Sequence, residues 1–448
     1  AAVEGADSAF SLLGGQLLAA LIAGLSSIVL ARQLGPEGYG RYSLSTTVAA
    51  LLTLATDFGL SAALTKEVSR LRAEGGEGEA ARLVGLALRF NLLASALALA
   101  VGLALAPQLT LLTLNRPELV QLSRLAMPLV AATSVFSLTY AALLGAGDAR
   151  ALPLLLLVRD ASRGVLSPLL ALSGGCEGAV AGFVLGYVIA AAAGVALLRR
   201  RFGGLPSAPW GELRRMLGYG LPLYASTILS AALGVYQNAV LAWFATDEEV
   251  GNLRVAGNFF ALLQLLSAPI SQALFPAFSR LDKGEAGVAF RYAVKYAALL
   301  LAPAGAFAAV ASRDLVRLVY GGAYRLAPAY LSVQAAVLLL SGAGWGVTGS
   351  FLQGVGDTGA LLKAAQVYAA AFVPLSLLLA PRAGALGVLV AGLASSLAST
   401  LYGLRAALRH GASLELRAAL TIPLAVLLAA APAYLASLAA WPHYAVRL

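Results

Sequence analysis

The chain has 448 residues, of which 60% are apolar and 12% are charged, and its formal net charge is +10. A soluble domain usually has about 45–50% apolar and about 25% charged residues, so this composition excludes an ordinary soluble protein and predicts a polytopic membrane protein. One cysteine and two histidines exclude a disulfide framework and a Cys/His metal cluster, and basic loops facing anionic lipid explain the positive charge without a nucleic-acid partner.

Long apolar runs, separated by clusters of Pro, Gly and charge, give thirteen candidate membrane spans of about 20 residues each. The runs are continuous rather than alternating, which predicts an all-α protein whose spans satisfy their own backbone hydrogen bonds. The predicted spans are 8–31, 42–65, 83–106, 119–145, 151–173, 177–198, 217–245, 250–278, 287–311, 326–353, 359–380, 384–408 and 416–438.

The two sides of the membrane follow from the basic residues. The first residues, AAVEGADSAF, carry acids where a secretory signal would carry Lys or Arg, so we expect no removable signal peptide. Lys and Arg are more frequent in the even-numbered connections between spans than in the odd-numbered ones. Because cytoplasmic loops are enriched in these residues, the pattern predicts a cytoplasmic N-terminus.

The fifth span contains three charges in the stretch LPLLLLVRDASRGVLSPLLAL, residues 152–172: Arg159, Asp160 and Arg163. At 1.5 Å per residue the two arginines lie about 12 and about 18 Å into the span. An arginine at that depth costs about 2.5–3.5 kcal/mol or more in contact with lipid, so we expect both to face a cavity inside the bundle. Their four-residue spacing puts them on one face, where Asp160 could also pair with them as a purely structural ion pair.

Other cations enter the spans, and only two clear acids, Asp57 and Asp160, oppose them. The surplus predicts an anionic cargo such as a diphosphate, since guanidinium groups match phosphate oxygens with paired donors. Instead of binding cargo, cations near the span ends could extend their charged groups to the membrane surface, which is called snorkelling. The two aspartates are candidates for ion pairs or for proton or sodium coupling. The further cations are Arg89, Arg124, Arg254, Arg291 and Lys295.

An internal repeat divides the chain. The segment LLGAGDARA, residues 143–151, aligns with FLQGVGDTGA, residues 351–360, so that Asp148 matches Asp357 at an offset of 209 residues. At nearly the same offset GPEGYGRYSL matches TDEEVGNLRVA. By itself a Gly-x-Gly-Asp segment indicates a tight turn with an aspartate cap, but two ordered correspondences indicate a duplication, which is common in transporters.

We therefore predict two six-helix lobes, 1–200 and 216–410, joined by a basic cytoplasmic linker, 201–215, with an additional transmembrane helix in 411–448. Because six is even, both halves enter the membrane from the same side, so their pseudo-twofold axis runs along the membrane normal. The arginines, prolines and Trp210 of the linker are typical of a segment lying at the membrane surface.

Four segments carry a family resemblance: SLLGGQLLAALIAGLSSIVLARQLGPEGYGRYSLSTT, DFGLSAALTKEVSR, GLPLYASTILSAALGVYQNAVLAWF and SAPISQALFPAFSRL. They resemble the polysaccharide-exporter (Wzx-type) flippases of the multidrug/oligosaccharidyl-lipid/polysaccharide (MOP) superfamily. The resemblance implies a MOP/MATE-like fold in the bacterial inner membrane, usually with fourteen spans rather than thirteen. It also implies alternating access and no resident cofactor.

The same resemblance implies the cargo, which is an undecaprenyl-diphosphate-linked oligosaccharide carried from the cytoplasmic to the periplasmic leaflet. Membrane lipids and polysaccharide polymerase or assembly proteins are the implied partners. Arg254 lies where flippases of this superfamily often carry a cavity arginine. We expect Arg159, Arg163, Arg89, Arg254, Arg291 and Lys295 to bind the diphosphate.

Three other functions compete with this interpretation. A MATE-like drug exporter shares the fold, but cationic drugs favour a carboxylate-lined cavity. A lipid II flippase fits the charges equally well. An enzyme such as a membrane glycosyltransferase would show a large external loop with catalytic residues, so we predict a transporter and not an enzyme. The absence of a G-x-x-x-x-G-K-[ST] loop argues against an ATP-driven pump.

Overall fold

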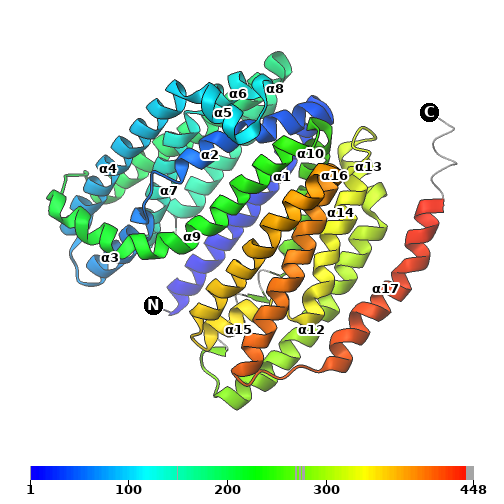
Figure 1. The fold of residues 1–448 in the computed structure, drawn as a ribbon. Coiled ribbons are helices and arrows are strands. Elements are labelled where there is room, and N and C mark those ends of the chain that lie inside the picture. Colours follow the sequence, from blue (N-terminus) through cyan, green and yellow to red (C-terminus); the bar gives the residue numbers. More distant parts are fainter. Residues whose placement is uncertain (1, 149, 268–269, 272–273, 275–277, 440–448) are drawn as a thin grey trace. The chain divides into compact units, whose positions relative to one another are not determined.

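A computed structural model of the chain describes residues 2–148, 150–267, 270–271, 274 and 278–439 (Figure 1). Within these residues all regular secondary structure is helical. The chain divides into two compact units, Ala1–Trp243 and Phe244–Leu448. Each unit has its own apolar core, formed in the first by residues such as Leu86 and Leu155 and in the second by residues such as Phe290.

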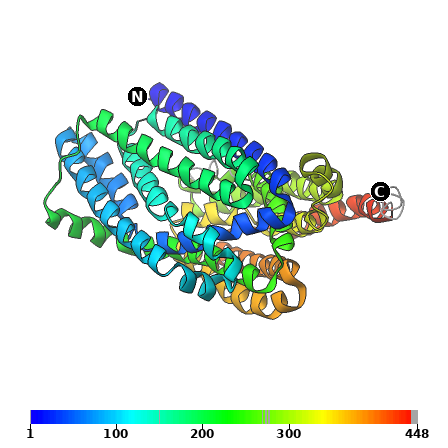
Figure 2. The same cartoon turned by 90° about the horizontal axis from the view of Figure 1, so that it is seen from above.

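In the first unit, α1 lies beside α8 along much of its length in both views (Figure 1, Figure 2), and α7 also packs on α8. The helix α9 is described with this unit up to Trp243. The helices are α1 (Ala2–Ser45), α2 (Thr47–Thr53), α3 (Leu60–Ala73), α4 (Glu77–Ala104), α5 (Ala106–Leu114), η1 (Pro117–Leu119), α6 (Val120–Ala126), α7 (Leu129–Gly145), α8 (Ala151–Phe202) and α9 (Trp210–Phe244).

In the second unit, α12 packs against η2, α14 and α17, and α15 packs against α16. The helices are α10 (Asp247–Gln264), α12 (Lys283–Val310), α13 (Ser312–Tyr320), α14 (Ala327–Ala335), η2 (Ala336–Ala343), α15 (Thr348–Gly354), α16 (Thr358–Arg409) and α17 (Leu416–Ala439). The predicted span 250–278 and the segment SAPISQALFPAFSRL lie partly outside the described residues.

Among the residues that the structure describes, five helices are long and apolar enough to cross a membrane, or up to seven if each of two bent helix pairs counts as one span. Part of the difference from the thirteen predicted spans arises because α8 and α16, with 52 residues each, both contain two predicted spans. The apolar parts of α9 and α17, Ile228–Phe244 and Thr421–Pro432, are shorter than a full span. Large apolar side chains such as Leu97 and Leu172 are more than two-thirds exposed on helix faces, which fits contact with lipid. The chain is a multi-pass membrane protein.

The predicted repeat has the same local structure in both copies. Gly147 and Gly356 turn the chain with positive φ angles of 60° and 81°. Directly after them, Asp148 accepts a hydrogen bond from the backbone N–H of Ala151 at 2.9 Å, and Asp357 accepts one from Ala360 at 2.9 Å. Both aspartates therefore cap the first turn of a 52-residue helix, as the sequence predicted.

The helix α9, which the predicted division assigns to the second lobe, contacts α3 closely. A β-carbon on Gly59 would lie 2.1 Å from the carbonyl oxygen of Gly220, so the two backbones meet where neither residue has a side chain. The Tyr224 hydroxyl donates to the carbonyl of Leu54, at the break between α2 and α3. These contacts place the start of α9 in the first unit, while the predicted lobe boundary stays a prediction.

Candidate functional site

The three charges of the fifth predicted span lie together on α8. Asp160 pairs with Arg159 at 2.7 Å and with Arg163 at 2.7 Å, and the Nε–H group of Arg159 donates a further hydrogen bond to it at 3.1 Å. The Asp160 side chain is only 3% exposed, whereas the two arginine side chains are 24% and 25% exposed. The carboxylate thus lies beneath the arginines and leaves them a net charge of +1.

Aromatic rings hold the two guanidinium groups from the side. Arg159 lies 5.1 Å from the ring centre of Phe136, while Arg163 lies 5.7 Å from that of Phe183 and 6.0 Å from that of Tyr187. A cation over an aromatic face is stabilised by the ring quadrupole, the more so where water is scarce. Carboxylate and rings together fix both arginines before any ligand arrives.

The arginines line a cavity of about 450 Å³ inside the first unit. One wall is formed by α1, which contributes Gln16 and small alanines, and another by α7, which contributes Phe136 and Tyr140. The remaining lining residues are Ser137 of α7 and, on α8, Leu156 and the three charged residues. The volume lies within the range of small-molecule sites, about 300–1,000 Å³, and the lining mixes apolar side chains with polar and charged ones.

The helix α8 is broken at Gly175, and glycines bring its second limb, the part after this break, against the face that carries the arginines. A β-carbon on Gly186 would lie 2.5 Å from the Cα atom of Arg163, and one on Gly182 would lie 2.3 Å from the carbonyl oxygen of Leu166. A β-carbon on Gly178 would likewise lie against the carbonyl oxygen of Leu170. This four-residue glycine spacing allows the two limbs to pack backbone against backbone, which fixes the position of Arg163.

The corresponding helix of the second unit lacks these charges. At the offset of 209 residues, Arg159 and Arg163 correspond to Tyr368 and Phe372 of α16, and Asp160 corresponds to an alanine. Tyr368 and Phe372 stack with ring centres 5.6 Å apart. The same helix in the second unit therefore packs with an aromatic pair in place of the ion triad, which argues against a purely structural role for the triad.

The structure does not bring every predicted cation to this cavity. Arg89 is exposed on α4, and no ion pair to it occurs among the described residues. In the second unit Arg291 lies 5.2 Å from the ring centre of Tyr292, and Lys295 pairs with Glu415 at 3.6 Å.

Arg254 is half-buried on α10, also in the second unit, and Arg124 is exposed on α6. Their binding roles, like those of Arg89, Arg291 and Lys295, stay predictions. Asp57 lies at the break before α3, where its carboxylate accepts hydrogen bonds from the backbone of Gly59 at 3.1 Å and from Ser61. These local bonds account for the position of Asp57, and its coupling role stays a prediction.

The sequence interpretation missed the aromatic residues of the site and its glycines. Phe136 and Tyr140, like Phe183 and Tyr187, are spaced four residues apart and so share a helix face. That spacing, beside the Gly-x-x-x-Gly-x-x-x-Gly run that ends at Gly186, is the signal that could have found them.

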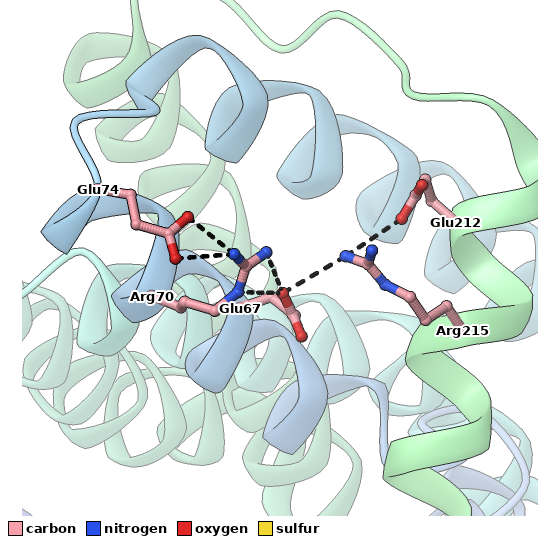
Figure 3. Close-up of polar contacts among 5 residues, drawn as sticks. All are labelled: Glu67, Arg70, Glu74, Glu212 and Arg215. Carbon is pink, nitrogen blue, oxygen red and sulfur yellow. Dashed lines mark hydrogen bonds and ion pairs between the residues drawn. The ribbon is translucent and has the colours of Figure 1, made fainter.

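A second charged cluster joins α3 to the start of α9 (Figure 3). Glu67 pairs with Arg70 at 2.9 Å and with Arg215 at 3.5 Å, while Glu74 and Glu212 complete the pairing of the two arginines. Hydrogen bonds to the neighbouring glutamates raise the pKa of Arg70. Since three acids face two bases and most of these side chains are exposed, the cluster has no surplus positive charge with which to hold an anion.

Comparison with solved structures shows the fold. A lipid II flippase, MurJ, in its inward-closed conformation has a TM-score of 0.78 at 14% identity, with 95% of this chain and 92% of that chain covered. An inward-facing multidrug-resistance MATE family transporter of the MOP superfamily has a TM-score of 0.72 at 18% identity, with coverage of 88% and 94%.

A MOP superfamily transporter from Pyrococcus furiosus, whose binding pocket is described as having reverse polarity, has a TM-score of 0.58 at 17% identity, with coverage of 90% and 93%. The predicted all-α MOP/MATE-like fold is therefore confirmed. The family described as "Polysaccharide biosynthesis protein" matches residues 6–282, more than half of the chain, and no curated protein matches the sequence.

Proposed function

Since this chain belongs to the polysaccharide biosynthesis protein family and has the fold of MOP superfamily transporters, we propose that it is a Wzx-type flippase for an undecaprenyl-diphosphate-linked oligosaccharide. The cargo moves from the cytoplasmic to the periplasmic leaflet of a bacterial inner membrane. The observation that carries this proposal is the cavity of the first unit, whose lining includes the two arginines Arg159 and Arg163.

The cavity suits the charged part of such a lipid. Guanidinium groups donate paired hydrogen bonds to phosphate oxygens, and Arg159 and Arg163 both keep donors that Asp160 does not use. A bare diphosphate in hydrocarbon would cost many kcal/mol, so a flippase must supply a polar path for it. The polyprenyl tail stays in lipid, and the glycan follows the diphosphate through the protein.

Transport follows alternating access. The diphosphate is captured from the cytoplasmic leaflet, and rocking of the lobes then opens the path to the periplasm. The N-terminus lies in the cytoplasm. A membrane potential that is negative inside favours outward movement of an anion by about 2.3 kcal/mol per charge per 100 mV. Proton or sodium coupling would use Asp57 or Asp160, and polysaccharide polymerase or assembly proteins would receive the product.

A lipid II flippase is the second candidate, since lipid II also presents a diphosphate and the lipid II flippase MurJ shares the fold. Growth of a strain depleted of the protein separates the two, because loss of lipid II transport is lethal whereas loss of a surface polysaccharide is tolerated. A drug exporter is less favoured, because the basic lining of the cavity repels organic cations.

The direct test is translocation in liposomes. Purified protein is reconstituted with a fluorescent polyprenyl-diphosphate oligosaccharide, and exposure of the label in each leaflet is followed for wild type and Arg163→Ala. We expect protein-dependent translocation that the substitution abolishes while the melting temperature is retained. If the folded wild type moves no substrate with proton and sodium gradients applied, the proposed cargo is wrong; if Arg163→Ala transports normally, the cavity is not the diphosphate site.

A further inference from the structure

Asp160 is the acidic residue in the lining of the cavity. A site built only to capture an anion would do so most strongly with two free arginines, yet a buried carboxylate contacts both of them at 2.7 Å. The corresponding helix α16 carries Tyr368 and Phe372 in the equivalent positions and packs without such a carboxylate. The presence of Asp160 calls for an explanation at the site itself.

The geometry leaves both arginines available to a second anion. Arg159 uses its Nε and Nη2 atoms on Asp160, and Arg163 uses Nη2. A guanidinium has five N–H groups, so each arginine retains donors, and each side chain is about a quarter exposed. Asp160 also lines the cavity, but its side chain is 3% exposed, so a ligand there meets mainly the arginines.

A transport site must release what it captures. Binding has to be favourable enough for entry and weak enough for exit, and a dry cavity strengthens every charge interaction within it. Two unopposed arginines would hold a diphosphate tightly and slow its departure. One carboxylate bound to both lowers the charge of the site from +2 to +1 and so weakens its attraction for a second anion.

We propose that Asp160 is a positioning residue that sets the affinity of the cavity for the anionic group, so that the captured diphosphate can leave. This inference rests on the proposed function, because it assigns the diphosphate to the cavity of the first unit. It predicts that the internal carboxylate weakens binding and speeds turnover. A carboxylate with a merely structural role would have the opposite effect on binding, since its loss would disorder the arginines.

The test separates affinity from rate in the full-length protein. Binding of inorganic pyrophosphate is measured by calorimetry in nanodiscs, and translocation of the fluorescent lipid is measured in liposomes as a function of lipid concentration. For Asp160→Asn we expect pyrophosphate to bind about tenfold tighter, since close charge pairs couple by at least that factor. In the same variant, the lipid concentration that gives half-maximal translocation should fall, and the maximal rate should fall with it. Asp160→Glu, which keeps the carboxylate, should bring both quantities back toward their wild-type values.

A second variant keeps the test decisive if Asp160→Asn does not fold. Gln16 lines the same cavity from α1, so Gln16→Glu adds an internal anion without breaking the triad. We expect it to weaken pyrophosphate binding several-fold, and Gln16→Asn serves as the matched neutral control. Unchanged or weaker binding in folded Asp160→Asn, or unchanged binding in Gln16→Glu, would overturn the inference. Failure of the wild type to bind pyrophosphate or to translocate the lipid would instead reject the proposed function.

Discussion

Gly175 and Gly384 lie 209 residues apart and break α8 and α16 with nearly the same backbone angles, φ 51° and ψ −130° in the first case and φ 54° and ψ −133° in the second. Residues with a β-carbon rarely adopt such angles, so each glycine marks the point where one span ends and the next begins. The duplication seen in the sequence therefore extends to the breaks between paired spans.

The two breaks should respond differently to alanine. Gly175→Ala introduces only backbone strain, because a β-carbon there meets no atom within 4 Å, whereas one on Gly384 would lie 2.3 Å from a carboxylate oxygen of Glu249. We expect both to lower the melting temperature, Gly384→Ala by more, with strain alone costing about 1–3 kcal/mol. Thermal unfolding in detergent measures this, and Gly174→Ala, in open space with an ordinary φ, is the control. Equal losses at both sites would contradict the contact with Glu249.

The glycine contact behind the cavity should be intolerant of a methyl group. In Gly186→Ala the new β-carbon meets the backbone of Arg163, so the limbs of α8 must separate. We expect a loss of about 1–3 kcal/mol, as for overpacked cores, together with weaker pyrophosphate binding because Arg163 moves. Gly174→Ala again serves as control. A stable Gly186→Ala variant with normal binding would show that this contact does not set the position of the arginine.

Acid should weaken the cap of α16 through Asp357. Its pKa is lowered first by the hydrogen bond with His410, whose Nε2 atom lies 2.7 Å from the carboxylate, and then by the bond from the Ala360 backbone. Because the pKa of Asp357 is lowered in the folded state, its carboxylate contributes to stability at pH values above its ordinary pKa of 3.8. This contribution is lost as the pH falls through the lower pKa of the folded state.

We expect His410→Ala to move this acid transition to higher pH, measured as melting temperature against pH. Asp148, at the matching position before α8, accepts hydrogen bonds from the backbone of Arg150 and Ala151. Asp148→Asn is therefore the matched control. His410→Ala should move the acid transition equally with and without Asp148→Asn. An acid transition that stays in place in His410→Ala would mean that the histidine does not set the pKa of Asp357.

The ion cluster between α3 and α9 should matter mainly at low ionic strength. Glu67 contacts both Arg70 and Arg215, so Glu67→Gln removes the ion pair between α3 and α9, whereas Glu74→Gln affects Arg70 alone (Figure 3). We expect Glu67→Gln to lower the melting temperature by a few degrees at most in 10 mM salt and by nothing measurable in 1 M salt, where the Debye length is about 3 Å. A salt-independent loss would indicate a packing defect instead.

The amino-acid sequence by itself determined that the chain spans a membrane, that it is all-helical and that it is duplicated. These properties follow from local patterns: apolar runs of bilayer length, and Gly-x-Gly-Asp turns whose aspartates cap the next helix. It also identified Arg159, Asp160 and Arg163 as a group, because residues three and four apart on one helix must share a face.

Only the tertiary structure decided which groups surround that face. The alanines of α1, the rings of α7 and the glycines of the second limb of α8 are distant in sequence, and packing brings them to the arginines. Tertiary packing also left Arg89 outside the cavity and made Asp160 a buried partner of two arginines. Burial and charge balance depend on neighbours from several helices, and no single span encodes them.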